Sequence, residues 1–200
     1  MIRIVIAEDQ SLLRGALASL LSLEPDIDVI AQAEDGQAAL ALVDEHDPDV
    51  LVADIEMPQL TGLDAAEALK LRGARTRVLI VTTFARPGYL QRALKAGVLG
   101  YVLKDAPSED LADAVRKVAA GQRAVAPELA EQAWASSADL TDREREILRQ
   151  VEAGRTNKEI ARALDLSPGT VRNYLADAAG KLGAANRIEA FQIARRNGWL

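Results

Sequence analysis

The sequence predicts an α/β protein in which a doubly wound, five-stranded parallel sheet is followed by a small all-α domain. The first observation behind this prediction is that short apolar runs alternate with helical periodicity over roughly the first 120 residues. The second is that four of these runs end on a polar side chain, as strands of a parallel sheet do at a binding edge. The third is that residues 140–200 show only helical periodicity, in short segments with clear caps.

The expected strands are short and mostly apolar. They comprise residues 2–7, 29–33, 50–53, 78–81 and 100–103. Four of them lead directly into chemically capable side chains, namely Glu8-Asp9, Asp54, Thr82-Thr83 and Lys104. The carboxyl ends of parallel strands lie along one edge, which is where the ligands of such sheets bind. We therefore expect three carboxylates, a hydroxyl group and an ammonium group to converge there.

The expected helices between these strands follow the spacing of their apolar residues. The first covers residues 10–23 and ends before Pro25, with an apolar stripe of Leu12, Leu13, Leu17, Leu20 and Leu21. Further helices are expected over residues 36–43, over residues 63–71 and from Pro87, since proline suits a first helical position. The last helix of this part covers residues 108–120, with Ser108 as its N-cap and an apolar stripe of Leu111, Val115 and Val118.

Asp54 is the residue on which the functional prediction depends. An acid after a strand is, by itself, as readily a helix cap or a turn acid as a reactive group. Three acids gathered in one place repel each other, so at neutral pH they require a divalent cation or a raised pKa. Oxygen ligands favour hard ions, and a site with few protein ligands suits Mg²⁺. A carboxylate in such a site can attack phosphorus to form an acyl phosphate, with Lys104 neutralising the phosphoryl oxygens and Thr82 donating a hydrogen bond.

Composition excludes several other classes of protein. The chain has no cysteine, which excludes disulfide frameworks, thiolate metal sites and cysteine nucleophiles. It has no run of about eighteen apolar residues and no secretion signal, so we expect a cytoplasmic protein without membrane insertion. Residues 1–140 contain 13 basic and 22 acidic residues, whereas residues 141–200 contain 11 and 8. The resulting net charges of −9 and +3 predict different partners for the two parts.

The segment between the two parts resembles a linker, and we expect domains at residues 1–121 and 140–200 with the linker at 122–139. In this linker, Pro127 precedes a short helical patch over residues 128–134, and residues 135–138 are small and polar. Trp134 is equally consistent with an anchor on one domain and with an incidental apolar contact.

Four short helices are expected after the linker. The first has Thr141 as its N-cap in a capping box with Glu144, and Gly154 ends it. A tight turn joins a second helix, over residues 157–164, to a third over residues 169–182 that Ser167 caps, and a fourth covers residues 187–197. This arrangement is typical of a helix-turn-helix, whose later helix enters the major groove of DNA. A small helical bundle that binds protein is the alternative.

The N-terminal motifs resemble the response-regulator receiver domain over roughly residues 1–120. The matching residues are Glu8-Asp9, Asp54-x-x-Met57-Pro58-x-x-x-Gly62, Thr82 and Lys104. The resemblance implies the flavodoxin-like strand order 2-1-3-4-5 and phosphorylation of Asp54 by a sensor histidine kinase. It implies Mg²⁺ held by Asp9, Asp54 and the backbone carbonyl of Glu56, with Glu8 acting directly or through water. It also implies that Thr82 and Tyr101 form a switch pair, while Asp105 departs from the proline that many receivers have after the lysine.

The C-terminal motifs resemble the LuxR-type helix-turn-helix over nearly all of residues 140–200. The matching stretches are Leu140-Thr-x-Arg143-Glu-x-Glu146, Gly154-x-x-Asn157-Lys-Glu-Ile-Ala161, Ser167-x-x-Thr170-Val-Arg172 and Lys181-Leu. A receiver joined to this module is identified as a NarL/FixJ type of response regulator. Residues 82–92 and 100–109 resemble its DesR subgroup, whose members regulate a membrane-lipid desaturase under a thermosensing kinase.

Side-chain chemistry assigns the expected DNA contacts. Arg172 can read guanine and Asn173 can read adenine, because both lie on the early turns of the expected recognition helix. Phosphate contacts, which set the register without reading sequence, are assigned to Thr156, Lys158, Thr170 and Lys181.

Together these features predict a transcription factor and not an enzyme. Phosphorylation of Asp54 is expected to promote a homodimer that binds two half-sites of double-stranded promoter DNA, with membrane-lipid genes as targets. The pairing surface is expected near residues 13–17 and 111–118. Two alternatives stay open: a phosphatase that uses Asp54 as nucleophile and Glu56 as second acid, and a receiver whose C-terminal domain binds protein.

Overall fold

The computed structural model of the chain describes residues 1–83, 86–126, 129 and 140–200. The chain divides into two compact units, the first made of residues 1–85 and 90–131 and the second of residues 86–89 and 132–200. Apart from residue 129, the helical patch and the small polar segment expected in the linker lie outside the described residues, as does Trp134. Among the described helices, none has the length and apolar character that a membrane crossing requires.

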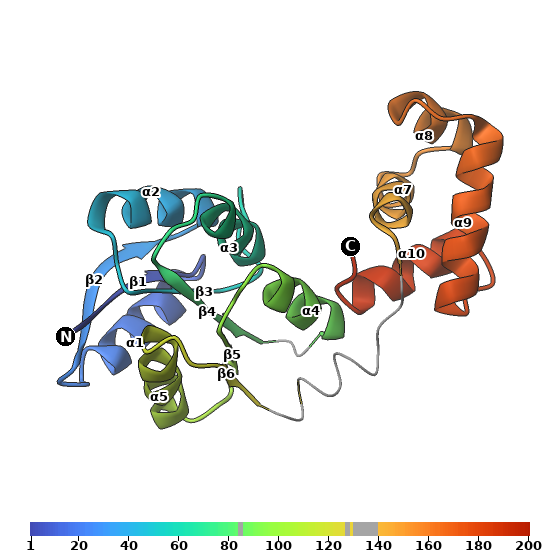
Figure 1. The fold of residues 1–200 in the computed structure, drawn as a ribbon. Helices are drawn as coiled ribbons and strands as arrows, with labels where there is room; N and C mark the ends of the chain where they lie inside the picture. The colour runs from blue at the N-terminus through green and yellow to red at the C-terminus, as the bar shows by residue number, and fades with distance from the viewer. Residues whose placement is uncertain (84–85, 127–128, 130–139) are drawn as a thin grey trace. The chain divides into compact units, whose positions relative to one another are not determined.

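The first unit is built on a six-stranded parallel sheet of order β2-β1-β3-β4-β5-β6 (Figure 1). Its strands are β1 (Ile2–Ala7), β2 (Ile27–Ala33), β3 (Val50–Ala53), β4 (Arg77–Thr82), β5 (Gly100–Leu103) and β6 (Ala124–Val125). The predicted order of the first five strands is confirmed. The sixth strand differs from the expectation: the N–H of Ala124 donates to the carbonyl of Leu99 at 2.8 Å and so extends the sheet beyond β5. Two residues are too few to show strand periodicity in the sequence.

Helices cover both faces of this sheet. They are α1 (Ser11–Leu21), α2 (Gly36–His46), α3 (Gly62–Leu71) and α5 (Ser108–Ala119), whereas α4 (Pro87–Lys95) has its first residues in the second unit and the rest in the first. α1 and α5 lie on one face, where Leu17, Leu21, Leu111, Val115 and Val118 pack against apolar side chains of β1, β3 and β4. α2 and α3 lie on the opposite face (Figure 1). Because both faces are covered, β3 is buried along its whole length, which is why its sequence is apolar throughout.

Two sequence-based details of these helices are wrong. In α1, Leu17 and Leu21 are buried as expected, but the side chains of Leu12 and Leu20 are 88% and 43% exposed. The helix buries only a narrow stripe against the sheet, and Leu12 and Leu20 lie outside that stripe. In α5, Pro107 occupies the N-cap position and Ser108 is the first helical residue, so the serine makes no side-chain cap.

In the part of the second unit that the structure describes, four helices surround an apolar core of their own. They are α7 (Asp142–Glu152), α8 (Asn157–Ala163), α9 (Pro168–Leu182) and α10 (Arg187–Arg196). The predicted caps are confirmed: Thr141 forms a capping box with Glu144, and Ser167 accepts a hydrogen bond from the backbone N–H of Thr170. Thr156 and Glu159 form a further capping box at α8. The core includes Ile147, Leu148, Ile160, Val171 and Ala190.

Glu144 is a buried acid that joins two helices of this unit. Its Oε2 atom lies 2.8 Å from Nζ of Lys181 on α9 and accepts the N–H of Thr141 at 2.6 Å. Burial by itself would raise the pKa of Glu144, but these donors outweigh it and hold the pKa below its ordinary value of 4.5. A lowered pKa in the folded state contributes stability that is present above pH 4.5 and is lost as pH falls through the folded-state pKa.

We therefore expect Glu144→Gln to lower the free energy of unfolding of the second unit by about 1–3 kcal/mol at neutral pH, because the substitution removes a charge-assisted hydrogen bond. The difference from wild type should shrink in acid, where Glu144 is itself protonated. Urea unfolding at neutral and acidic pH measures both effects. Glu146→Gln is the matched control, since Glu146 pairs with Arg143 in a more exposed position and should contribute less than about 1 kcal/mol. Equal losses in the two variants would contradict this account.

Candidate functional site

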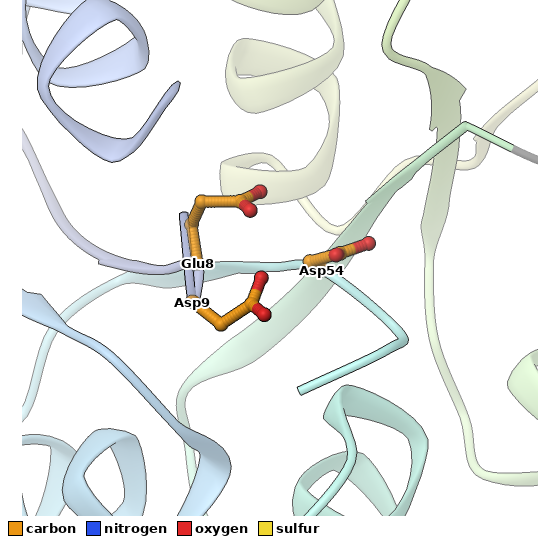
Figure 2. A group of neighbouring side chains, drawn as sticks. All are labelled: Glu8, Asp9 and Asp54. Carbon is orange, nitrogen blue, oxygen red and sulfur yellow. The ribbon is translucent and has the colours of Figure 1, made fainter. Parts of the chain in front are cut away.

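Three acidic side chains lie together at the carboxyl edge of the sheet. Figure 2 shows Glu8 and Asp9 just after β1 and Asp54 just after β3. The two strands are neighbours, because Ala7 pairs with Ala53 and the N–H of Asp54 donates to the carbonyl of Ala7 at 2.9 Å. One carboxylate oxygen from each acid lies within 4.8 Å of the other two. The structure thus brings together the three acids that the sequence places at strand ends.

Lys104 joins this cluster from the position after β5. Its Nζ atom lies 2.7 Å from Oε2 of Glu8 and 2.9 Å from Oδ2 of Asp54, and its side chain is only 7% exposed. Burial would lower the pKa of this ammonium group, but its two carboxylate partners outweigh the burial and raise the pKa. Burial raises the pKa of Glu8 and of Asp54, since Lys104 offsets it only in part. Three carboxylates against one ammonium group leave a pocket that favours a further cation.

The turn after Asp54 is held by close backbone contacts. The N–H of Ile55 donates to Oδ1 of Asp54 at 2.7 Å, which fixes one carboxylate oxygen. The N–H of Gly62, the first residue of α3, donates to the carbonyl of Ile55 at 3.2 Å. A Cβ atom at position 62 would lie 2.0 Å from the carbonyl oxygen of Asp54. Only glycine lets α3 begin this close to the acid.

The remaining predicted residues of this site lie on or beside the same strands. Thr82 is the last residue of β4 and is 1% exposed, and its carbonyl accepts the N–H of Lys104 at 2.8 Å. Tyr101 lies on β5, paired with Ile80, and its ring is buried. Glu56 lies two residues after Asp54, and its side chain is exposed. Thr82 and Tyr101 therefore lie on adjacent strands that lead to the acidic pocket.

The donor set of this pocket fits Mg²⁺. Carboxylate oxygens are the hard ligands that Mg²⁺ selects, and the ion keeps several waters, so three protein oxygens suffice. Two oxygens on one Mg²⁺ are at most about 4.2 Å apart, twice its bond length. The oxygens of Glu8, Asp9 and Asp54 lie within 4.8 Å of each other, so small side-chain movements would bring them into range. The exposed side chain of Asp9 provides an opening to solvent.

A second candidate surface is the exposed side of α9. Arg172 and Asn173 point into solvent near the start of the helix, whereas Val171 and Leu175 are buried beneath them. Lys158, on α8, is exposed as well. This is the arrangement that presents one helix face to a groove of DNA.

The other three residues assigned to phosphate have partners within the protein. Thr156 uses its hydroxyl in the capping box of α8, and the hydroxyl of Thr170 lies 2.8 Å from that of Ser167. Lys181 makes the ion pair with Glu144. Their assignment to DNA stays a prediction.

The structure shows two hydrogen-bond donors to Glu8 that the sequence did not predict. The backbone N–H of Gln10 donates to Oε1 of Glu8 at 3.3 Å, and the side chain of Arg14 donates from α1 to the carbonyl of Glu8. Backbone donors leave no residue-type signal. The one available signal for Arg14 is a basic residue one turn into the helix that follows an acidic pair.

The chain is similar along its whole length to known regulatory proteins. Residues 4–116 match the family described as "Response regulator receiver domain", and residues 138–194 match "Bacterial regulatory proteins, luxR family". The transcriptional regulatory protein DesR of Bacillus subtilis is 53% identical over 199 residues, which cover 100% of this chain and 99% of DesR. The uncharacterized regulatory protein YvfU of the same organism is 52% identical over 200 residues, with 100% of both chains covered. The crystal structure of the response regulator ChrA, of a heme-sensing two-component system, is 36% identical with a TM-score of 0.59, covering 100% of this chain and 98% of ChrA.

Proposed function

We propose that this chain, which belongs to the response regulators that join a receiver domain to a LuxR-type DNA-binding domain, is switched by a phosphoryl group on Asp54. The proposal rests on the acidic pocket. In it, Lys104 lies between Glu8 and Asp54, and Asp9 adds a third carboxylate. We assign the receiver to residues 1–121, the linker to 122–139 and the DNA-binding domain to 140–200. The phosphoryl donor would be a histidine kinase, the usual partner of a receiver domain.

The chemistry of transfer follows from the groups around Asp54. A carboxylate oxygen of Asp54 forms a bond to phosphorus as the bond from phosphorus to the histidine nitrogen breaks, and an acyl phosphate results. Lys104 is within ion-pair distance of this carboxylate and neutralises charge on the phosphoryl oxygens. The hydroxyl of Thr82 is proposed to donate to the group once it is transferred. Glu8, Asp9, Asp54 and the carbonyl of Glu56 would hold Mg²⁺, which when bound supplies further positive charge.

The acyl phosphate would act on the rest of the chain through Thr82 and Tyr101. Added charge at the sheet edge draws the Thr82 hydroxyl, and the buried ring of Tyr101 on the adjacent strand adjusts with it. Pairing of two copies is proposed to use α1 and α5. Leu17, Leu111 and Val115 themselves face the sheet, so the pairing surface would be the opposite, exposed side of both helices.

The paired molecules would place two copies of α9 on two DNA half-sites. Arg172 and Asn173 are proposed to read base edges, with Lys158, Thr156, Thr170 and Lys181 on phosphates. A net charge of +3 over residues 141–200 predicts weak binding by one copy, which pairing would overcome by raising the effective concentration. On the resemblance to the DesR subgroup, we extend the proposal to genes of membrane lipids, and we propose that the protein acts in the cytoplasm, where its DNA is.

Treatment with acetyl phosphate and Mg²⁺, followed by intact-mass measurement, tests this function. We expect one phosphoryl group per chain, and none when EDTA removes the metal ion. Continuous turnover of a phosphomonoester would instead support the phosphatase alternative, with Glu56 as its second acid. A C-terminal domain that binds protein would give no salt-dependent binding to promoter DNA, whereas a DNA-binding domain must give it.

Arg172→Ala should lose sequence discrimination at one base pair. A guanine contact contributes about 1–3 kcal/mol of discrimination, and alanine cannot replace its two hydrogen bonds. Fluorescence anisotropy with the operator and with single-base variants measures the loss. Lys158→Ala is the control: it should weaken binding to all sequences alike and reduce the salt dependence. If Arg172→Ala weakens all sequences equally, Arg172 is a phosphate contact.

A further inference from the structure

The carbonyl group of Glu8 needs a hydrogen-bond partner that the sheet does not supply. β1 ends at Ala7, where its register with β3 also ends. The N–H of Glu8 still donates to the carbonyl of Ala33 on β2 at 3.1 Å, but the carbonyl of Glu8 lies beyond the ladder. Its partner is Nη1 of Arg14. A side chain therefore completes the hydrogen bonding at the end of β1, as backbone groups out of solvent require.

Arg14 is well placed to hold this carbonyl. Its backbone N–H donates to the carbonyl of Gln10 at 2.9 Å, so the residue lies in the first turn of α1. The side chain is half-buried and turns back toward the strand end from which the helix departs. A guanidinium group is always charged at physiological pH, so the donor is present under all relevant conditions.

The held carbonyl belongs to the peptide group that joins Glu8 to Asp9. Glu8 and Asp54 are each fixed through their carboxylates, by Lys104 and by the N–H groups of Gln10 and Ile55. For Asp9, in contrast, the described part of the chain offers no hydrogen bond to either its side chain or its backbone N–H. The direction of the Asp9 carboxylate depends in part on the orientation of the peptide group before it, and Arg14 donates a hydrogen bond to the carbonyl of that group.

We propose that Arg14 is a positioning residue for the Mg²⁺ site: by holding the Glu8–Asp9 peptide it directs the Asp9 carboxylate toward Glu8 and Asp54. This inference rests on the proposed function, because it concerns the same pocket. Substituting a residue that orients a metal ligand without touching the metal ion typically weakens metal binding by about 10–100-fold. Arg14→Ala should therefore raise the dissociation constant for Mg²⁺ on the order of tenfold.

Isothermal titration of Mg²⁺ into the full-length, unphosphorylated protein tests this directly. Arg14→Lys keeps one donor for the carbonyl and should recover most of the affinity that Arg14→Ala loses. Arg75→Ala is the control for charge: Arg75 is exposed on the loop before β4, and its loss should leave the dissociation constant unchanged. A second readout is the backbone amide resonance of Asp9, which should shift in Arg14→Ala without Mg²⁺ and much less in Arg14→Lys.

The Mg²⁺ affinities of the wild type and of the two Arg14 variants show whether Arg14 positions the Asp9 carboxylate. Wild-type affinity in Arg14→Ala overturns the inference. An equal loss of affinity in Arg14→Ala and Arg14→Lys, together with a lower melting temperature in both, shows a general packing role and overturns it as well. If the wild-type protein itself binds no Mg²⁺, the proposed function fails and the role of Arg14 fails with it. Loss in Arg14→Ala with recovery in Arg14→Lys supports it.

Discussion

Asp54→Ala protein is expected to take up no phosphoryl group from acetyl phosphate in the presence of Mg²⁺. The substitution removes the nucleophile, and the nearby acids cannot replace it. Glu8 is engaged by Lys104 and by the N–H of Gln10, and Asp9 lies on the neighbouring strand end. Intact-mass measurement after a fixed reaction time should show full modification of the wild type and only the unmodified mass for the variant.

Asp105→Asn is the matched control for this experiment. It removes one carboxylate from the residue directly after Lys104, but Asp105 is exposed and is not part of the three-acid group. We expect it to be phosphorylated like the wild type. Phosphorylation of Asp54→Ala at the wild-type rate would mean that another residue is the acceptor, and the proposed role of Asp54 would be wrong.

Gly62→Ala is expected to lower the free energy of unfolding of the receiver by about 2–4 kcal/mol. This loss is near the upper limit of what an added carbon atom costs in a tightly packed position. The added Cβ would lie 2.0 Å from the carbonyl oxygen of Asp54 and 3.3 Å from Cβ of Ala53. These are backbone and strand atoms, which cannot turn aside as the end of a flexible side chain can. Relief requires α3 to move from the strand, which also displaces the turn that carries Asp54. Urea unfolding monitored by circular dichroism measures the loss.

Gly15→Ala provides the opposite control. Gly15 lies within α1, and a Cβ there would meet no atom within 4 Å. Alanine is a better helix former than glycine, so this variant should gain about 0.5–1 kcal/mol. If Gly62→Ala and Gly15→Ala change stability in the same direction and by similar amounts, the close approach at position 62 is not what requires glycine.

Most of the sheet could be predicted from the sequence because parallel strands carry a strong signal. The clearest case is β3, a continuous apolar run buried on both faces that ends abruptly at Asp54, whereas β2 carries Asp28 and Gln32, is only partly buried and gives a weaker signal. The same topology explains why the acidic pocket could be anticipated. Glu8, Asp54 and Lys104 are far apart in the chain, but they follow parallel strands of one sheet, whose carboxyl ends lie at the same edge.

The features that could not be predicted depend on tertiary contacts. Helical spacing makes Leu12 look like a core residue, but only the approach of α1 to the sheet decides which leucines are buried. The pairing of Lys181 with Glu144 joins residues 37 positions apart, and an exposed lysine on a recognition helix is equally well suited to phosphate. Arg14 reaches a backbone carbonyl, a group that every residue has, so no pattern of residue types indicates the contact.

We propose that a phosphoryl group on Asp54 determines how two copies of this chain meet on DNA. Sedimentation of the wild-type protein with a labelled promoter fragment, before and after full phosphorylation, tests it most directly. We predict that the unmodified protein is monomeric and binds weakly, and that the phosphorylated protein sediments as a dimer and binds the same fragment more tightly. If the fully phosphorylated protein stays monomeric and binds the fragment with unchanged affinity, the phosphoryl group does not control pairing on DNA.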